Sequence, residues 1–394
     1  MTLAHLVQHV FPWSQRKYQA FHVNHNLRAT AVREASIVQN WLMQWGMPCE
    51  ILTWEHEGPS SGVQEKARDA RYELLTAACL RFGITSLLMA HQADDQLETF
   101  FMRLGRGSGI KGLQGMSRQR EIKKGLTLCR PMLTLSRTQI MSHATAHNVP
   151  FLEDPSNKNA AFKRVALRQK LGPFLQNENQ DLYQQSLRRI RLANEALEFM
   201  VRTRLAAFGQ LHPEGYATLS LAAFENVPLE LVYRQVETLL MCVSGKKYPP
   251  RFASLTGICH ELEEGKSLRG RTLAGCYLIS KKGTLHVYRE IKAIEKPRKV
   301  NEKGNFYWDQ RFFIDNIKEV DITTDTEVGA LGGKGLSVLR KQGHSLHDLP
   351  AMVAQSLPAF WVKGILHSVP LLVYMPHESV ARVRFLPLYP FGKL

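Results

Sequence analysis

Strand-like and helix-like segments alternate over residues 1–154, and this order constrains the fold more than any other feature. Residues 18–23 (YQAFHV), 49–54 (CEILTW) and 85–90 (TSLLMA) are short runs typical of strands. Apolar residues recur at helical spacing over 3–10, 33–45, 64–82 and 94–104. The alternation predicts an α/β fold with a Rossmann-like parallel sheet and helices on both of its faces. Ligands of such sheets bind beyond the carboxyl ends of the strands.

The pattern changes after residue 179. Residues 182–208 have the spacing of a long helix, and we expect more helix through about Cys242. Residues 271–289 alternate like a β-hairpin with Lys281, Lys282 and Gly283 at the turn, and the charged segment 292–303 suits a linker. The sequence therefore predicts three domains, at 1–175, at 180–291 with helical and hairpin character, and at 304–394 as a small C-terminal domain.

Charge is the strongest signal in the composition. The 51 Lys and Arg residues exceed the 35 Asp and Glu residues, which gives a formal net charge of +16. Such an excess favours a polyanionic partner such as nucleic acid, because neutralised phosphates release counterions. A basic enzyme without such a partner is the alternative.

The cysteines and the first residues bear on location. None of the 6 cysteines has CxxC spacing, which disfavours a zinc ribbon or a redox pair. Residues 1–10 (MTLAHLVQHV) lack the basic start and small-residue cleavage site of a signal peptide. We expect a cytoplasmic protein without a membrane-spanning segment.

A carboxylate cluster directly follows the strand predicted at 85–90. His91, Asp94, Asp95 and Glu98 open the next helix, and their spacing places the carboxylates on one helix face. Acidic residues in a first helical turn are ordinary partners of the helix dipole. Three carboxylates beside a histidine exceed that need, and clustered oxygens suit Mg²⁺ with bound phosphates. We interpret this segment as part of a nucleotide site.

A glycine-rich basic loop follows without a gap. Arg103, Arg106 and Lys111 alternate there with Gly105, Gly107, Gly109 and Gly112. Glycines let backbone amides approach an anion, and the cations add charge. The alternative is a glycine-capped helix end, since the run is neither a Walker A loop nor a GxGxxG fingerprint.

Other polar segments fall where this kind of sheet presents its substrate edge. Asp154, Pro155, Ser156 and Asn157 have turn chemistry, and Lys163, Arg164 and Arg168 follow them. His25 and Arg28 lie in the loop after the strand at 18–23, and Arg68 and Arg71 lie one turn apart on the helix at 64–82. A plain loop and a solvated helix face are the alternatives.

Together these segments resemble the tRNA(Ile)-lysidine synthetases of the N-type ATP pyrophosphatase superfamily. The resemblance rests on VNHNLR at 23–28, ARDARY at 67–72, AHQADDQLETFFMRLGRGSGIKGLQGM at 90–116, RPMLTLSR at 130–137 and EDPSNKNAAFKR at 153–164. Residues 271–290 are similar to the hairpin of the family's tRNA-binding domain. Residues 1–175 would then be the ATP-pyrophosphatase catalytic domain, of adenine nucleotide α-hydrolase type, and 180–291 the tRNA-binding domain.

The resemblance implies a reaction on the wobble cytidine of tRNA(Ile) with a CAU anticodon. ATP, with Mg²⁺, adenylates O2 of the base, and free L-lysine then attacks C2 and expels AMP, which leaves lysidine. Carried over by motif, Asp95, Glu98 and Arg71 would be catalytic, and His91, Asp94, Arg103 and Arg106 would bind the nucleotide. The implied tRNA contacts are His25, Arg28, Lys111, Asp154, Asn157, Arg164 and Arg168.

The sequence departs from the family pattern in two places. The SGGxDS pyrophosphate loop of the family, with the strand before it, has no counterpart here, and Met1 aligns just after that loop. A mis-chosen start codon or a decayed gene would explain this N-terminally truncated pattern. The family also shows Arg-Asn after its DPSN loop, where this chain has Arg164-Val165.

Two alternative functions follow from these observations. A thiolase of the same superfamily would commonly need paired or reactive cysteines, and the chain has no CxxC. A catalytically impaired tRNA-binding remnant would follow if the pyrophosphate loop were lost.

Overall fold

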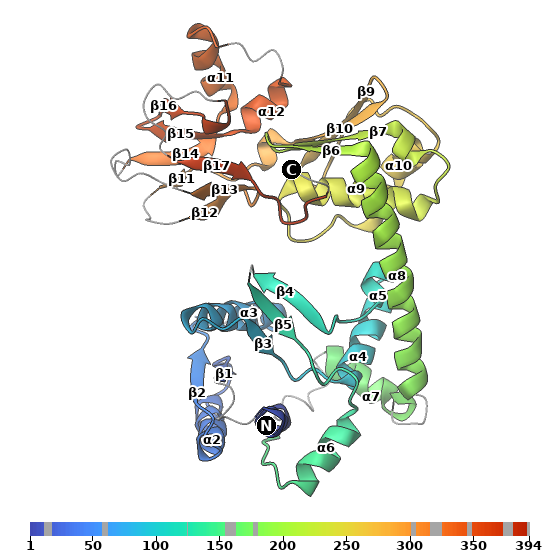
Figure 1. Cartoon of the computed structure of the whole chain (residues 1–394), viewed down its shortest axis with the longest axis vertical. Coiled ribbons are helices and arrows are strands. Elements are labelled where there is room, and N and C mark those ends of the chain that lie inside the picture. Colours follow the sequence, from blue (N-terminus) through green and yellow to red (C-terminus); the bar gives the residue numbers. More distant parts are fainter. Residues whose placement is uncertain are drawn as a thin grey trace. The chain divides into compact units, whose positions relative to one another are not determined.

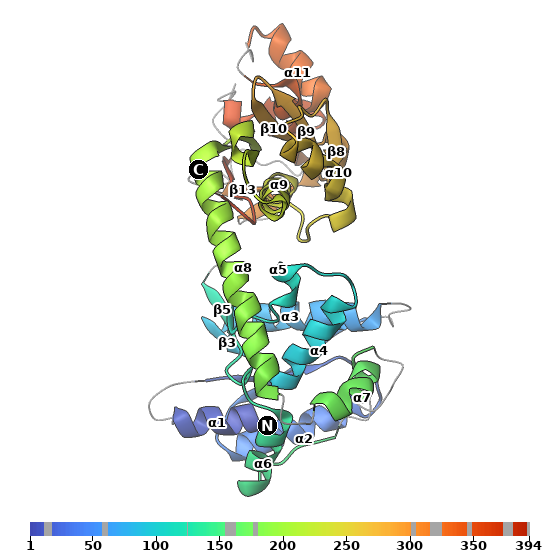
Figure 2. The ribbon, with the colours of Figure 1, turned by 90° about the vertical axis from the view of Figure 1, so that its right-hand side faces the viewer.

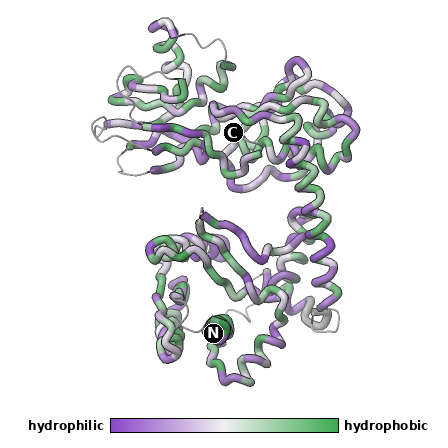
Figure 3. The backbone as a smooth tube through the Cα atoms, in the orientation of Figure 1, coloured by the Kyte–Doolittle hydropathy of each residue, from purple (hydrophilic) through white to green (hydrophobic). Residues whose placement is uncertain are grey.

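Two pairs of parallel strands form the α/β part of the chain in this computed structural model (Figure 1). Strand β1 (Ala20–Asn24) pairs with β2 (Cys49–Thr53), and β3 (Ser86–Leu88) pairs with β5 (Leu126–Cys129). The polar strand β4 (Gln119–Lys123), purple in Figure 3, adds an antiparallel edge to β5, where its charged side chains discourage further pairing. The predicted α/β fold and its parallel pairing are confirmed.

The structure describes residues 1–11, 18–56, 62–123, 125–153, 163–175, 180–300, 305–315, 325–344, 349–372 and 381–391. These residues fall into two compact units, Met1–Asn194 and Glu195–Leu394. The three-domain division at 1–175, 180–291 and 304–394 stays a prediction.

One hydrophobic core joins the two parallel pairs, although within the described ranges they belong to separate sheets. Leu75, Ala78 and Cys79 of α3 (Val63–Arg81) pack in it with Leu52 of β2 and Leu128 of β5. Because α3 serves both pairs, their strands need no direct hydrogen bonds to share a core. The helices of this unit, besides α3, are α1 (Thr2–Val10), α2 (Ala31–Gln44), α4 (Ala93–Leu104), α5 (Ile110–Leu113), α6 (Arg137–Ala146) and α7 (Lys163–Leu175).

Two further helix contacts shape the first unit. Helix α4 packs against α7 and, through Leu97 and Leu187, against the first part of α8 (Gln180–Phe208), as Figure 2 shows. Helix α1 packs on α6, where the rings of His5, His9, His143 and His147 gather. Among the helices drawn from the described residues, none is both long and apolar enough to cross a membrane.

More helix was predicted up to about Cys242, and helix α9 (Leu229–Ser244) confirms this from residue 229 on, but a hairpin interrupts the region before it. Strands β6 (Gly209–His212) and β7 (Tyr216–Ser220) precede α9. Pro213 cannot donate within a helix, and Gly215 at the turn has φ +87°, which favours glycine. The alternation in Tyr216–Ser220 then buries Ala217 and Leu219 in the core.

The second unit contains a five-stranded antiparallel sheet of order β6-β7-β10-β9-β8. The hairpin predicted at 271–289 is confirmed: β9 (Cys276–Lys281) and β10 (Thr284–Arg289) join through Lys282 and Gly283, both at positive φ. Positive φ at both turn residues matches the twist of a tight hairpin. Strand β8 (Arg271–Leu273) and helices α9 and α10 (Phe252–Glu263) complete this part, with short 3-10 turns at Leu221–Phe224 and Ile291–Ala293.

The rest of the second unit adds two small sheets, of order β11-β14-β15-β16 and β12-β13-β17. Its large core runs from Val201 to Phe391 and so draws on both of the domains predicted after residue 180, while a smaller core surrounds Leu339 and Leu357. The segment expected as a linker also contributes β11. The elements are β11 (Arg298–Lys299), β12 (Phe306–Trp308), β13 (Phe312–Asp315), β14 (Thr326–Ala330), α11 (Gly332–Lys341), α12 (Ala351–Ser356), β15 (Pro358–Val362), β16 (Ile365–Ser368), the 3-10 turn Pro370–Leu372 and β17 (Arg382–Phe385).

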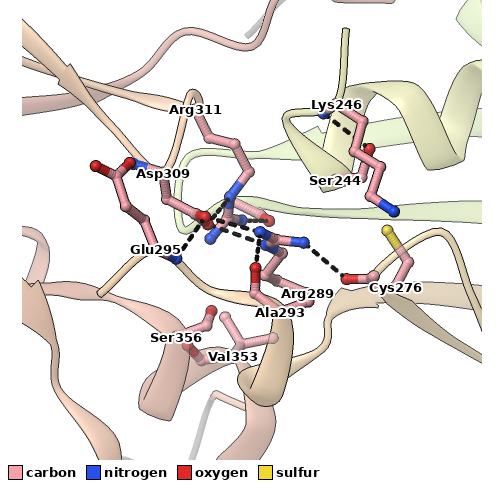
Figure 4. Close-up of polar contacts among 12 residues, drawn as sticks. Ser244, Lys246, Cys276, Arg289, Ala293, Glu295, Asp309, Arg311, Val353 and Ser356 are labelled. Atoms are coloured by element: carbon pink, nitrogen blue, oxygen red, sulfur yellow. Dashed lines mark hydrogen bonds and ion pairs between the residues drawn. The ribbon is translucent and has the colours of Figure 1, made fainter. Parts of the chain in front are cut away.

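A buried ion network ties these sheets together (Figure 4). Arg289 donates to both carboxylate oxygens of Asp309 at 2.9 and 2.7 Å, and Arg311 donates to Asp309 at 2.7 Å. The backbone N–H of Glu295 donates to Oδ1 of Asp309, and the backbone N–H of Asp309 donates to Oε2 of Glu295. Burial alone would raise the pKa of Asp309, but the hydrogen bonds from Arg289 and the charge of Arg311 outweigh it and lower that pKa. The carboxylate therefore stays ionised between two guanidinium groups.

Replacing Asp309 with alanine should destabilise the protein strongly, because two buried guanidinium groups then lose their counter-charge. We expect a loss of about 3–5 kcal/mol in the free energy of unfolding, measured by urea denaturation. The matched control is Asp325→Ala, which removes the exposed pair of Asp325 with Lys363 at 3.9 Å and should change stability by at most about 1 kcal/mol. Equal losses in the two variants would contradict the network's role.

Candidate functional site

The loop after β1 has a shape fixed by asparagines. Asn24 is 4% exposed, and its Oδ1 accepts a hydrogen bond from the backbone N–H of Asn26 at 2.9 Å. Asn26 has φ +50°, a left-handed conformation that asparagine tolerates better than most residues. This turn places His25 just beyond the carboxyl end of the strand.

His25 and Arg71, both predicted site residues, contact each other there. Arg71 on α3 donates to Nε2 of His25 from Nη2 at 2.9 Å and from Nε at 3.3 Å. Burial, followed by the charge of Arg71, lowers the pKa of His25 to about 4. The imidazole is therefore neutral at physiological pH and accepts from a fixed cation. Arg28 is held elsewhere, in an ion pair with Glu34 at 2.9 Å.

His91 lies beyond the carboxyl ends of β3 and β5. Arg130, which follows β5 and is 4% exposed, donates from Nε to Nδ1 of His91 at 3.2 Å and from Nη1 to the Ser117 carbonyl at 2.9 Å. Burial first, and then the charges of Arg130, Arg68, Arg164 and Arg71, lower the pKa of His91 to about 4. Parallel pairing of β3 and β5 explains the contact, because it brings both carboxyl ends to one edge.

Arg68, Arg71, Arg130 and Arg164, whose charges act on His91, form an arginine cluster. Arg103 belongs to it as well, because the charges of Arg68 and Arg164 act on Arg103. Its members come from α3, α4, α7 and the end of β5. Concentrated like charge is unfavourable by itself and raises the local concentration of anions. The cluster therefore suits phosphate groups.

The carboxylates of α4 point to different partners. Asp94 accepts from the backbone N–H of Arg137, the first residue of α6, at 2.8 Å. Asp95 accepts from the backbone N–H of Gln92 at 2.9 Å, as the third residue of a capping box does. In the described part of the chain, no three acidic, histidine or cysteine side chains converge as metal ligands. Asp94 and Asp95 therefore each have a backbone partner in the structure, and a Mg²⁺ site at these carboxylates stays a prediction.

Glu98 and Arg168, which were predicted from distant segments, form an ion pair between a buried carboxylate and a half-buried guanidinium group. Arg168 on α7 donates to Oε1 of Glu98 from Nε at 2.7 Å and from Nη2 at 2.6 Å. Glu98 is 1% exposed, and its Oε2 has no hydrogen-bond partner among the residues that the structure describes. Burial raises the pKa of Glu98, and the opposing charge of Arg168 does not cancel this effect.

The side chains of Arg103 and Gln96 fix the end of the glycine-rich loop to α4 by hydrogen bonds. Arg103 donates from Nη1 to the carbonyls of Gly112 at 2.6 Å and Gly115 at 3.2 Å. Gln96 donates to the Met116 carbonyl at 2.8 Å and accepts from its N–H at 2.6 Å. A Cβ at Gly115, which has φ +78°, would lie 2.7 Å from Oε1 of Gln96, so only glycine fits.

The remaining predicted residues differ in exposure and position. Arg106 is exposed on the loop, Lys111 is exposed on the short helix α5, and Arg164 is a half-buried member of the arginine cluster. Asp154 and Asn157 lie outside the described residues. Sequence reasoning missed Arg130 and Gln96: Arg130 directly follows a strand, which is a usable signal, whereas nothing in the spacing of Gln96 announces its loop contact.

Comparisons with known proteins show which family this chain is similar to. Residues 1–175 match a family model described as a PP-loop domain. The tRNA(Ile)-lysidine synthase of Ruegeria pomeroyi is 30% identical over 374 residues, which cover 94% of this chain and 85% of that protein. The Wolbachia pipientis wMel synthase is 33% identical, over 74% of this chain and 68% of that protein. The Anaplasma marginale synthase is 33% identical, and the match spans 74% of this chain but only 63% of that relative.

Among solved structures, the U34-tRNA thiolase NcsA from Methanococcus maripaludis with its 4Fe-4S cluster matches 48% of this chain and 67% of its own. The identity is 12% and the TM-score 0.39. The sequence matches are far more extensive, and on them the chain belongs to the tRNA(Ile)-lysidine synthase family.

Proposed function

We propose that this chain joins free L-lysine to C2 of the wobble cytidine of tRNA(Ile) with a CAU anticodon, with ATP as the activating substrate. The observation that carries the proposal is the pairing of two kinds of subsite. Glu98 is a buried carboxylate with one oxygen unpaired among the described residues, and Arg164 of the arginine cluster acts on it. The carboxylate of Glu98 suits the amine of lysine, and the neighbouring arginine cluster suits the phosphate of an adenylated base.

The proposed reaction has two steps. O2 of the cytidine attacks the α-phosphorus of ATP, the bond to the bridging oxygen breaks, and pyrophosphate leaves. A neutral amine of lysine then attacks C2, the C2–O2 bond breaks, and AMP leaves with that oxygen while the nitrogen loses a proton. Adenylation is needed because the oxygen of cytosine is otherwise a poor leaving group.

Glu98 and Asp95 are the proposed partners of lysine. A carboxylate whose pKa is raised by burial is better matched to accepting a proton near neutral pH than an exposed one. Asp95 lies close enough for its charge to act on Glu98. We assign Glu98 as the base or the ammonium-binding group, and Asp95 as its electrostatic partner.

The cationic residues are assigned to phosphates and RNA. Arg71 would contact the activated intermediate, and His91, Asp94, Arg103 and Arg106 would lie against the nucleotide, although Asp94 also anchors α6. The proposed contacts with tRNA are His25, Arg28, Lys111, Asp154, Asn157, Arg164 and Arg168. Of these, Arg168 reaches the site by its ion pair with Glu98.

Mg²⁺ would arrive with the phosphates of ATP, since the described side chains offer it no cluster of ligands. When bound it would neutralise phosphate charge. A cytoplasmic location stays a prediction from the sequence.

Lysine incorporation into an unmodified tRNA(Ile) transcript, with and without ATP, tests the function. Glu98→Gln should lower kcat/KM by about 10²–10⁴-fold if Glu98 acts as a base, with tRNA retention on filters unchanged. Glu73→Gln, the same change at an exposed position of α3, is the control and should keep the wild-type rate. Absence of ATP-dependent incorporation by the wild-type chain would refute the function, whereas full activity of Glu98→Gln would refute only the assigned role.

Asp95 needs a test that separates chemistry from helix capping. Asp95→Asn keeps an oxygen that can accept from the Gln92 N–H and removes only the charge, so stability should hold while lysidine formation falls. Asp95→Ala should also lose about 1 kcal/mol of stability in urea. An active Asp95→Asn enzyme would show that Asp95 is a capping residue alone.

The low pKa values of His25 and His91 predict a pH dependence of stability. In the unfolded chain both rings take up a proton near their ordinary value of 6.5, whereas the folded chain binds it only near pH 4. Stability should therefore fall as pH drops from about 6.5 to 4, because the unfolded state binds more protons. Urea midpoints measured at pH 7.5 and 5 should differ less in a His25→Asn/His91→Asn variant, and an equal or larger difference would contradict the assignment.

A further inference from the structure

Trp54 and His56 lie beside the site and have no role in the function proposed above. They follow β2 directly, and the backbone N–H of Trp54 donates to the Asn24 carbonyl at 2.9 Å. This hydrogen bond joins the last residue of β1 to the residue that follows β2, and so continues the pairing one residue past the end of β2. Trp54 is therefore held at the carboxyl edge of the sheet, where ligands of α/β proteins bind.

Three rings gather at these two strand ends. The ring centroids of Trp54 and His56 lie 4.1 Å apart at an interplanar angle of 43°. The rings of His25 and Trp54 form a T-shaped pair at 6.3 Å and 86°. His56 Nε2 lies 3.0 Å from the His25 carbonyl oxygen. Contacts among adjacent ring systems limit the rotation of the indole and so preorganise it.

The surroundings of Trp54 are unlike those of a core tryptophan. The indole is half-buried and packs on imidazoles, whereas the aliphatic core of this unit forms around Leu52, Leu75 and Leu128. A single exposed tryptophan on a surface needs no explanation. This one stands next to His25, which Arg71 of the arginine cluster contacts, so an aromatic face and a guanidinium cation share one edge.

We infer that Trp54, positioned by His56 and His25, provides the stacking face for a nucleobase of the reaction. A nucleotide presents a flat π face together with a phosphate, and the edge offers an indole together with Arg71. The bases at hand are the adenine of ATP and the cytosine of the tRNA, which share this stacking chemistry. The inference rests on the proposed function, since it names how that site would hold a base.

The test compares Trp54→Ala with Trp54→Phe, with Trp41→Ala, which removes another half-buried tryptophan of the same unit, as the control. Base–aromatic stacking contributes about 1–3 kcal/mol per base, which corresponds to roughly 5- to 150-fold in affinity. In the lysine-incorporation assay Trp54→Ala should raise the KM for ATP or for tRNA by at least about fivefold with little change in kcat. Trp54→Phe keeps a π face and should stay within about twofold of wild type.

A change in the KM for ATP alone would assign adenine to Trp54, and a change in the KM for tRNA alone would assign cytosine. Unchanged values for both substrates, or equal defects in the Phe, Ala and control variants, would overturn the inference. Calorimetric binding of ATP, and of an RNA hairpin with a CAU loop, needs no turnover. It therefore separates failure of the stacking face from failure of the proposed reaction, and urea unfolding of each variant separates both from misfolding.

Discussion

Parallel pairing is the constraint on which the candidate site depends. Because β1 and β2 run the same way, as do β3 and β5, the residue after each strand emerges at the same edge of its sheet. His25 and Trp54 meet at one such edge, and His91 and Arg130 meet at the other. Side chains that are far apart in the sequence are thus brought together by backbone hydrogen bonds before any of them makes a specific contact.

The second requirement is to hold many guanidinium groups close together without unfolding the unit. His25 and His91 help to hold these groups in place, because both rings stay neutral and each accepts a hydrogen bond from an arginine. Glu98 supplies the counter-charge for Arg168 on α7. The neutral acceptors fix the positions of the cations and leave their charge available for phosphates, whereas a carboxylate on every arginine would cancel it.

Much of the α/β unit could be predicted from periodicity, because its strands and helices carry regular apolar patterns. The hairpin β6–β7 could not, since its strands are short and follow a long helix without a break. In the site, the pairing of Glu98 with Arg168 spans 70 positions and depends on the packing of α7 on α4, which no local pattern encodes. The spacing of Asp94 and Asp95 was ambiguous for a physical reason: acidic residues at a helix start serve equally as backbone acceptors and as ligands, and here each has a backbone donor.

The Gln96 clamp on Met116 has a consequence for how this region tolerates change. Its two hydrogen bonds fix the end of the glycine-rich loop to the same helix that begins it, so the loop is a closed excursion from α4. Lengthening a flexible loop between fixed ends costs only about 0.6 kcal/mol for each doubling of its length. Insertions around Gly107 would thus leave α4 and its carboxylates in place. The positions of Arg106 and Lys111 relative to a polyanion can then differ between relatives without any change in the arrangement of Asp95 and Glu98.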